Sequence, residues 1–142
     1  MIFIFRVCIC GCRDFTDYAF FKEKCLFLLK NKLPNVVIVS GGARGVDALA
    51  EQFAKEFNLQ NEIFKADWEK FGRSAGPRRN EEMVKVSDGV IAFWDYHSKG
   101  TKTTIDFSKK YNVNCKIIRI GDFENEWTER YYESLFEQGL KR

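Results

Sequence analysis

The sequence contains little proline, little histidine and little excess charge. Its 142 residues include two prolines and one histidine, and the formal net charge is +3. With 45% apolar and 15% aromatic residues, the composition excludes a disordered chain. The charge excludes a strongly acidic protein and gives weak support for a nucleic acid partner. The length suits one domain with its own core.

Long hydrophobic runs are also absent. No apolar run approaches the roughly 20 residues that a membrane-spanning helix needs. The apolar residues 1–5 are followed at once by Arg6, and no basic region precedes them. We therefore expect a strand there rather than a signal peptide, and a cytoplasmic protein with no membrane partner.

The five cysteines and the single histidine have no familiar metal-binding spacing. Cys8, Cys10 and Cys12 alternate along one predicted strand. We expect all three on one face of it, as neighbours in a reduced protein. No C-x-x-C pair is present, so we expect no metal site. His97 has no context for a catalytic pair, and we expect it to touch ligand or solvent.

Apolar runs and helical spacings alternate along the chain. Strands are predicted at residues 2–10, 36–39, 62–66, 89–94 and 115–120. Helices are predicted at residues 17–32, 46–57, 78–86, 101–111 and 125–139, with a loop at 67–77. Such alternation predicts a parallel sheet covered on both faces, and ligands bind such sheets beyond the carboxyl ends of the strands.

Glycines, hydroxyls and charged residues follow four of these strands. They lie at residues 11–14, 40–47, 66–68 and 95–101. The segment at 40–47, Ser-Gly-Gly-Ala-Arg-Gly-Val-Asp, leads from a buried strand into an amphipathic helix. Glycines allow close approach of a ligand, and the first helix amides are free to bind phosphate. The sequence is not a Walker A motif, and an ordinary tight turn is the alternative.

Further polar and aromatic residues fall near the same edge. Asp67 follows the third strand, where dinucleotide folds place a ribose-binding acid, although a helix cap is an equal alternative. Residues 98–101 offer a second anion-binding helix start. Arginines around Gly76 suit phosphate, although at least one is expected in solvent. Trp68 is a candidate to stack on a base, and Trp94 fits the core as well.

These motifs, in this order, resemble the YspA-like branch of the SLOG superfamily. The resemblance rests on residues 11–15, 40–47, 66–68, 72–80, 92–94 and 98–101, and spans about residues 3–120. It implies a Rossmann-like fold that binds nucleotides or their derivatives. Relatives include the LONELY GUY phosphoribohydrolases and DNA-processing protein A. Members of this branch are common in phages and mobile elements.

The sequence departs from the patterns of these families at two positions. The LONELY GUY motif GGxGTxxE is matched at Gly100 and Thr101, but its catalytic glutamate position is occupied by Thr104. A hydroxyl cannot replace a carboxylate beside a developing oxocarbenium ion. Asp106 should face elsewhere on the helix. Cys12 stands where the family usually has serine, and still allows close approach of a ligand.

We therefore expect an α/β, Rossmann-like, five-stranded parallel sheet of order 3-2-1-4-5 over residues 1–122. A helical extension at 123–142 is expected to pack on it. The predicted ligand-binding residues are Gly11, Cys12, Arg13, Asp14, Ser40, Gly41, Gly42, Ala43, Arg44, Gly45, Val46, Asp47, Asp67, Trp68, Arg73, Gly76, Arg79, Asn80, Trp94, Asp95, Ser98, Lys99, Gly100 and Thr101.

Three functions stay open. The first is a sensor or sequestering protein for a phosphate-bearing nucleotide, with no cofactor required. Amides of residues 42–46 and 100–101 would hold the phosphate, and Asp47 and Asp67 would bind ribose. The second is an N-glycosidase that uses Asp47, Asp67 or Asp95 as its acid. The third is single-stranded DNA binding, which the low charge disfavours. A monomer and a homodimer are both possible.

Overall fold

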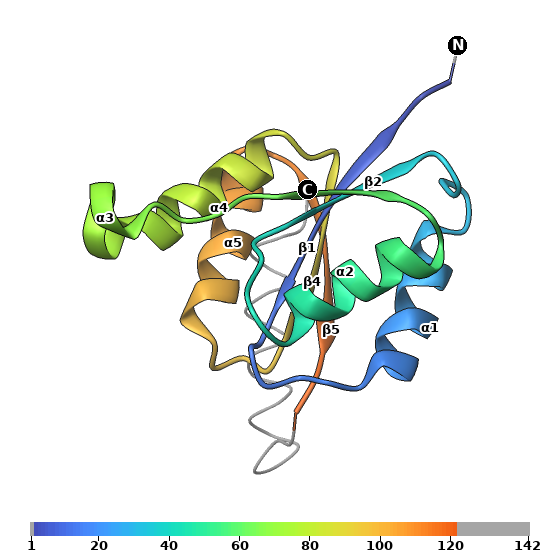
Figure 1. Ribbon diagram of the computed structural model, residues 1–142, viewed down its shortest axis with the longest axis horizontal. Coiled ribbons are helices and arrows are strands. Elements are labelled where there is room, and N and C mark those ends of the chain that lie inside the picture. The colour runs from blue at the N-terminus through green and yellow to red at the C-terminus, as the bar shows by residue number, and fades with distance from the viewer. Residues whose placement is uncertain (1, 122–142) are drawn as a thin grey trace.

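The five predicted strands form one parallel sheet, in the order β3-β2-β1-β4-β5 that the sequence predicts. The computed structural model describes residues 2–121 (Figure 1). The strands are β1 (Phe5–Gly11), β2 (Val36–Ser40), β3 (Gln60–Ile63), β4 (Gly89–Trp94) and β5 (Asn114–Arg119). Every neighbouring pair of strands is parallel.

Helices cover both faces of this sheet (Figure 1). The elements are α1 (Tyr18–Leu29), α2 (Val46–Glu56), α3 (Trp68–Phe71), the 3-10 turn η1 (Gly72–Ser74), α4 (Ala75–Lys85) and α5 (Lys99–Lys110). One cluster of buried side chains joins the sheet to α1 and α2, and a second joins it to α4 and α5. The fold therefore has three layers, as expected.

The predicted hydrophobic patterns account for this packing. Every residue of β2 and of β4 is buried, as a strand covered on both faces requires. In α2, the spacing of Val46, Leu49 and Phe53 places all three against the sheet. Burying such side chains contributes about 1.5–3 kcal/mol each.

Two predictions in the middle of the chain were wrong. The third strand is Gln60–Ile63 rather than 62–66, because its register against β2 ends where Ser40 pairs with Ile63. Residues 67–77 are not a loop but contain α3, η1 and the start of α4. Asp67 caps α3, and its Oδ1 accepts the amide of Lys70 at 3.1 Å. Pro77 falls in the first turn of α4, where no amide is needed.

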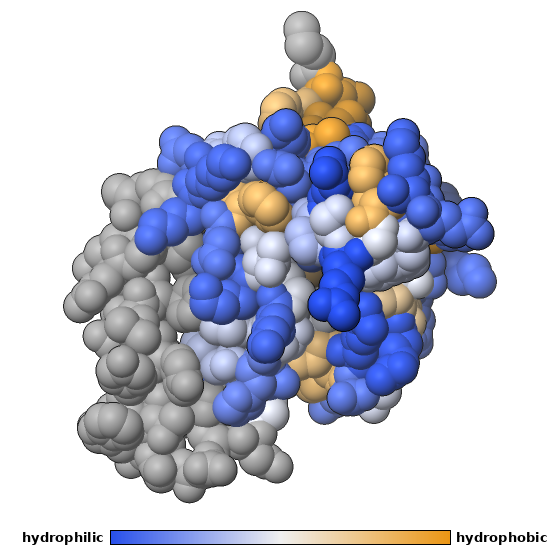
Figure 2. Space-filling view, turned by 90° about the vertical axis from the view of Figure 1, so that its left-hand side faces the viewer, coloured by the Kyte–Doolittle hydropathy of each residue, from blue (hydrophilic) through white to orange (hydrophobic). Residues whose placement is uncertain are grey.

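The first strand also begins later than predicted, at Phe5 rather than at residue 2. Phe5 pairs with Val36, the first residue of β2, and Val7 pairs with Gly89, the first residue of β4. The residues before Phe5 therefore lie beyond the sheet. Ile2 and Phe3 are 70% and 66% exposed. The N-terminal end of the chain, marked in Figure 1, projects as an apolar patch at the top of Figure 2, whereas the face around α3 to α5 is mostly hydrophilic.

The prediction that three cysteines share one face was wrong. Cys8 and Cys10 pack with the α4 and α5 layer, but Cys12 belongs to the cluster on the opposite face. The reason is that β1 ends at Gly11, so the strand alternation does not extend to Cys12.

The predicted helix at 125–139 and the extension at 123–142 lie outside the described residues. No helix within residues 2–121 is both long and apolar enough to cross a membrane.

Candidate functional site

A cavity of about 450 Å³ opens at the carboxyl ends of β1 and β4. We call it the first cavity. Its lining comes from the loops after β1, β2 and β4 and from α4 and α5, which the sequence places far apart. The lining residues are Cys10, Gly11, Cys12, Arg13, Asp14, Ala43, Arg44, Asp47, Arg79, Asn80, Met83, Asp95, His97, Ser98, Gly100, Thr101 and Thr104.

A second cavity, of about 460 Å³, adjoins the first on the side of β2 and β3. The residues that line only this second cavity are Gly41, Gly42, Lys65, Ala66 and Trp68. The two cavities share a wall made of Arg13, Ala43, Arg44 and Arg79. Three of the four shared residues are arginines. Their positive charges border both cavities, so an anion bound between the cavities would lie beside them.

The glycine-rich turn after β2 is held against the loop after β1. Gly45 has φ +73°, and a Cβ atom there would lie 2.4 Å from the carbonyl oxygen of Cys12. The next amide, of Val46, donates to that same oxygen at 3.1 Å. The amide of Ala43 donates to Oδ2 of Asp47 at 3.1 Å. The prediction that all amides from Gly42 to Val46 face the ligand therefore needs correction, because these two have partners within the protein.

Arg79 ties three loops of the site together. Its Nη1 donates to the carbonyl oxygen of Gly41 at 2.8 Å and to that of Phe64 at 3.3 Å. Its Nε donates to Oδ1 of Asn80 at 2.8 Å. Asn80 in turn donates from Nδ2 to the carbonyl oxygen of Gly100 at 3.4 Å. This chain of bonds links the ends of β2 and β3 to α5, so Arg79 both carries charge and shapes the site.

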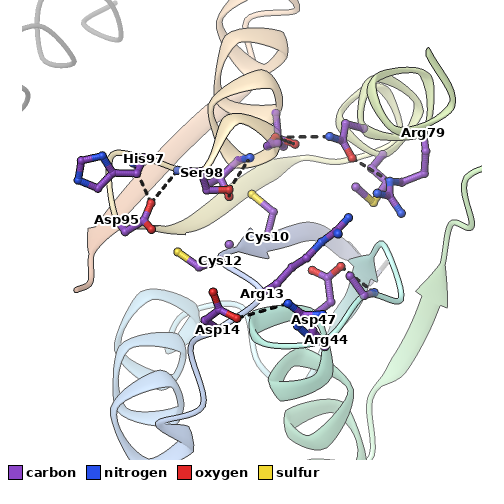
Figure 3. A pocket seen from close by; sticks show the side chains of 17 residues that line it. Cys10, Cys12, Arg13, Asp14, Arg44, Asp47, Arg79, Asp95, His97 and Ser98 are labelled. Atoms are coloured by element: carbon purple, nitrogen blue, oxygen red, sulfur yellow. Dashed lines mark hydrogen bonds and ion pairs between the residues drawn. The ribbon is translucent and has the colours of Figure 1, made fainter. Parts of the chain in front are cut away.

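The other two arginines come from the loops after β1 and β2. Nη2 of Arg44 lies 3.5 Å from Oδ1 of Asp14, and both side chains are exposed, so this ion pair is weak and can open. Figure 3 shows Arg13, Arg44, Asp47 and Arg79 on one side of the first cavity. The first cavity also contains three carboxylates, of Asp14, Asp47 and Asp95, whereas the residues that line the second cavity include none.

Two aspartates of the first cavity have pKa values shifted in opposite directions. Burial raises the pKa of Asp47, although the Ala43 amide, Arg79 and Arg13 oppose the shift. Burial would also raise the pKa of Asp95, but the amides of Ser98 and His97 outweigh it and hold this pKa below its ordinary value. Both amides donate to Oδ1 of Asp95 at 2.8 Å (Figure 3).

Cys12 lies between the two sides of the cavity (Figure 3). Burial, together with the charge of Asp95, raises the pKa of its thiol to about 11. A thiol with such a pKa is almost entirely protonated at neutral pH and is a poor nucleophile. Cys12 therefore acts as a small wall residue, as its place in the motif suggests.

The structure brings most of the predicted site residues together. Those that line the first cavity are Gly11, Cys12, Arg13, Asp14, Ala43, Arg44, Asp47, Arg79, Asn80, Asp95, Ser98, Gly100 and Thr101. Gly41, Gly42 and Trp68 line the second. Segments 40–47 and 98–101 thus contribute to the same cavity. Within the described part of the chain, eight predicted residues line neither cavity: Ser40, Gly45, Val46, Asp67, Arg73, Gly76, Trp94 and Lys99.

Some of these eight have evident structural roles. Asp67 caps α3, which was the alternative to ribose binding. Trp94 is buried in the core, and its Nε1 donates to the carbonyl oxygen of Ser98 at 2.9 Å. Ser40 is buried, and its hydroxyl donates to Oδ1 of Asn61 at 3.2 Å. Gly45 begins α2, and Val46 is in the core.

Six lining residues are absent from the predicted list, namely Cys10, Lys65, Ala66, Met83, His97 and Thr104. Met83 lies four positions after Arg79 on α4, so helical spacing from Arg79 identifies it. Lys65 follows β3 at the same sheet edge as the other loops. Cys10 precedes Gly11 at the end of β1, and was expected only as a neighbour of Cys8 and Cys12. No group of three metal-ligating side chains is found within residues 2–121.

Comparisons with known proteins agree with this fold. The profile of the YspA, cpYpsA-related SLOG family matches residues 5–71. The gene 61 protein of Mycobacterium phage D29 is 34% identical over an alignment of 123 residues, which covers 82% of this chain and 97% of that protein. This chain belongs to the YspA, cpYpsA-related SLOG family. A phage relative also fits the expected distribution of this branch.

Two solved structures resemble this SLOG protein in fold. DNA processing protein A from Streptococcus pneumoniae has a TM-score of 0.69 at 19% identity, over 97% of this chain and 58% of that one. This SLOG protein thus spans little more than half of that structure. The protein of the same name from Helicobacter pylori, studied for its single-stranded DNA binding mode, has a TM-score of 0.61 at 24% identity, over 93% and 73% of the two chains.

Proposed function

We propose that this SLOG protein binds a phosphate-bearing nucleotide, as a sensor or a sequestering protein, and does not turn it over. The observation that carries the proposal is the shared wall, where Arg13, Arg44 and Arg79 border both cavities. Guanidinium groups suit phosphate oxygens because they bind them in a bidentate manner. The wall stands at the carboxyl edge of a parallel sheet, where ligands of such folds bind.

The charge distribution supports phosphate at this wall and in the second cavity. The described residues that line the second cavity include Lys65 besides the three arginines, and no carboxylate. The first cavity contains carboxylates on its walls, among them Asp47 and Asp95. A phosphate is therefore stabilised most at the wall and on its second-cavity side.

The absence of turnover is proposed from Thr104. This residue lines the first cavity at the position where the LONELY GUY enzymes have glutamate. It is 1% exposed, and its hydroxyl donates to the carbonyl oxygen of Gly100 at 3.3 Å. Asp106 does not replace the glutamate, because it is exposed and forms an ion pair with Lys102 at 2.9 Å.

N-glycosidic hydrolysis is a second candidate, favoured by Asp47 and Asp95. Two carboxyl groups with pKa values shifted apart are the arrangement that supplies a proton donor and a charged partner in glycoside cleavage. In this reaction Asp47, with the raised pKa, would protonate the leaving base. Asp95 would stabilise the positive charge of the sugar. Asp67 is no longer a candidate, since it caps α3 outside both cavities.

Mass spectrometry distinguishes the two functions. The protein is incubated with NAD, ADP-ribose, cyclic nucleotides and nucleoside monophosphates, and the small molecules that it releases on denaturation are identified. We expect one intact nucleotide in stoichiometric amount. A free base that accumulates with time, and that disappears in Asp47→Asn or Asp95→Asn, would establish hydrolysis instead. Recovery of no nucleotide at all would refute the proposal.

A single-stranded oligonucleotide serves as a comparison ligand. Because the net charge is only +3, we expect weak binding with little dependence on salt. Tight binding that weakens steeply with salt would favour a DNA-binding function, as studied in the Helicobacter pylori protein.

A further inference from the structure

We infer that the ligand is a pyrophosphate-bridged nucleotide: a nucleoside diphosphate whose second phosphate carries a polyhydroxylated group such as a sugar. The inference rests on the proposed function and specifies its ligand class. It follows from three features of the site, namely two adjoining cavities, a cationic wall between them, and different chemistry at their two far ends.

The first feature is the size of the two cavities. Each, at about 450 and 460 Å³, has by itself the volume of a small-molecule site, for which the usual range is roughly 300–1,000 Å³. A nucleoside monophosphate would occupy one cavity and leave the other to water. A ligand with two bulky ends would fill both.

The second feature is the position of the cations. Arg13, Arg44 and Arg79 form the boundary between the cavities and belong to the lining of both. The greatest concentration of positive charge therefore lies between the two ends of the site. A molecule bound along both cavities needs its negative charge in its middle, as in a pyrophosphate diester.

The third feature is the chemistry of the two ends. Beyond the arginines, the first cavity is lined by Asp95, His97 and Ser98, none of which is fully buried (Figure 3). These groups suit the hydroxyls of a sugar, whereas a terminal phosphate would be repelled by Asp95, whose amide partners keep it charged. The second cavity presents Trp68, which is 54% exposed and offers a flat apolar surface for a base.

The test compares matched pairs of ligands by isothermal titration calorimetry on the full-length protein. The pairs are ADP with ADP-ribose, UDP with UDP-glucose and GDP with GDP-mannose. We expect the sugar ester of at least one pair to bind about tenfold more tightly than its diphosphate. If a diphosphate binds but no ester improves on it by more than twofold, the inference fails while the proposed function stands. If no member of any pair binds, the inference fails, and the proposed function fails with it only if the mass spectrometry also recovers no nucleotide.

Two pairs of variants locate the two ends of the ligand. Asp95→Asn retains an acceptor for the amides of Ser98 and His97 but removes the charge that would accept sugar hydroxyls, and should reduce the affinity for the sugar ester about fivefold without weakening that for the diphosphate. The control is Asp106→Asn, because Asp106 is an exposed aspartate that pairs with Lys102 and lines neither cavity. An equal loss for both ligands in Asp95→Asn would contradict the placement of the sugar.

Trp68→Ala should weaken the ester and the diphosphate by the same factor, since both carry the base. Phe71→Ala is its control, because Phe71 is an exposed aromatic residue of the same short helix and lines neither cavity. Thermal unfolding of every variant verifies that the fold is kept. A loss confined to the ester in Trp68→Ala would reverse the assigned orientation and overturn this part of the inference.

Discussion

The amide of Val46 donates a hydrogen bond of 3.1 Å to the carbonyl oxygen of Cys12, so that the first turn of α2 is held by the loop after β1. The bond fixes two strand ends of the site relative to each other. It also occupies an amide that would otherwise be available to a ligand phosphate. The close approach of the two loops depends on Gly45, since a Cβ atom there would meet the Cys12 oxygen at 2.4 Å.

Gly45→Ala should therefore lower the free energy of unfolding by about 3 kcal/mol and weaken nucleotide binding, because it adds a backbone clash to an unfavourable positive φ. Gly72→Ala is the matched control. Gly72 also has a positive φ, of 56°, but a Cβ atom there would have no neighbour within 4 Å. It should lose only about 1 kcal/mol. Urea unfolding measures both, and equal losses would contradict the proposed clash.

Arg79→Met should weaken nucleotide binding at least tenfold, because it removes a cation of the shared wall and releases the carbonyl oxygens of Gly41 and Phe64. Arg78→Met is the control, since Arg78 is exposed, bonds Ser74 at 3.0 Å and lines neither cavity. Both variants lose one positive charge. If calorimetry gave the same loss for both, general electrostatic attraction rather than the wall would explain binding.

Glu62→Gln should lower stability at pH 7 by about 1 kcal/mol and have little effect near pH 3. Arg6 donates two bonds to Glu62, at 2.5 and 2.6 Å, and this lowers the pKa of Glu62 below its ordinary value of 4.5. A carboxyl with a lowered pKa stabilises the fold above its ordinary pKa, and the contribution is lost as the pH falls through the folded value. Urea unfolding at several pH values tests this. A difference that persisted at low pH would contradict it.

Asp47→Asn should show the opposite pH dependence. Because burial raises the pKa of Asp47, its contribution to stability is complete below the ordinary value of 3.8 and declines as the pH rises through the folded value. Asparagine retains an acceptor for the Ala43 amide and carries no charge. The variant should gain stability relative to the natural protein between pH 4 and pH 7 in unfolding experiments. A relative loss over this range would show that Arg13 and Arg79 outweigh burial.

The thiol of Cys12 should react slowly with iodoacetamide in the folded protein at pH 7.5, because its pKa is raised to about 11. Cys115, with a pKa raised to about 12 mainly by burial, should behave in the same way. In urea both should react at the rate of an ordinary thiol. Peptide mass spectrometry follows each site, and rapid labelling of Cys12 in the folded state would identify it as a reactive cysteine.

Much of the fold could be predicted because its signals are local. The all-apolar runs at Val36–Val39 and Gly89–Trp94 require strands with both faces covered, and the spacing from Val46 to Phe53 requires a helix with one apolar face. The glycines, arginines and hydroxyls after the strands predicted the edge at which the cavities lie. A parallel sheet brings these strand ends together whatever the lengths of the segments between them.

The errors arose where a local pattern competes with a contact distant in sequence. The predicted strand already ended at residue 10, and the error was to extend its alternation to Cys12, which lies one residue beyond β1 with its side chain on the opposite face. The sequence around Asp67 fits a helix cap and a ribose ligand equally well. The structure places α3 directly after Asp67, and Asp67 caps that helix.

The sequence by itself determined the order of strands and helices, the family and the types of residue at the ligand edge, because these depend on hydrophobic period and motif. The tertiary structure alone decided which groups are available to a ligand. It assigned the Val46 amide to Cys12, set Arg79 across the carbonyl oxygens of Gly41 and Phe64, and left a wall of three arginines between two cavities. The physical reason is that a buried polar group must find a partner, and which partner it finds depends on what folding brings within hydrogen-bond distance.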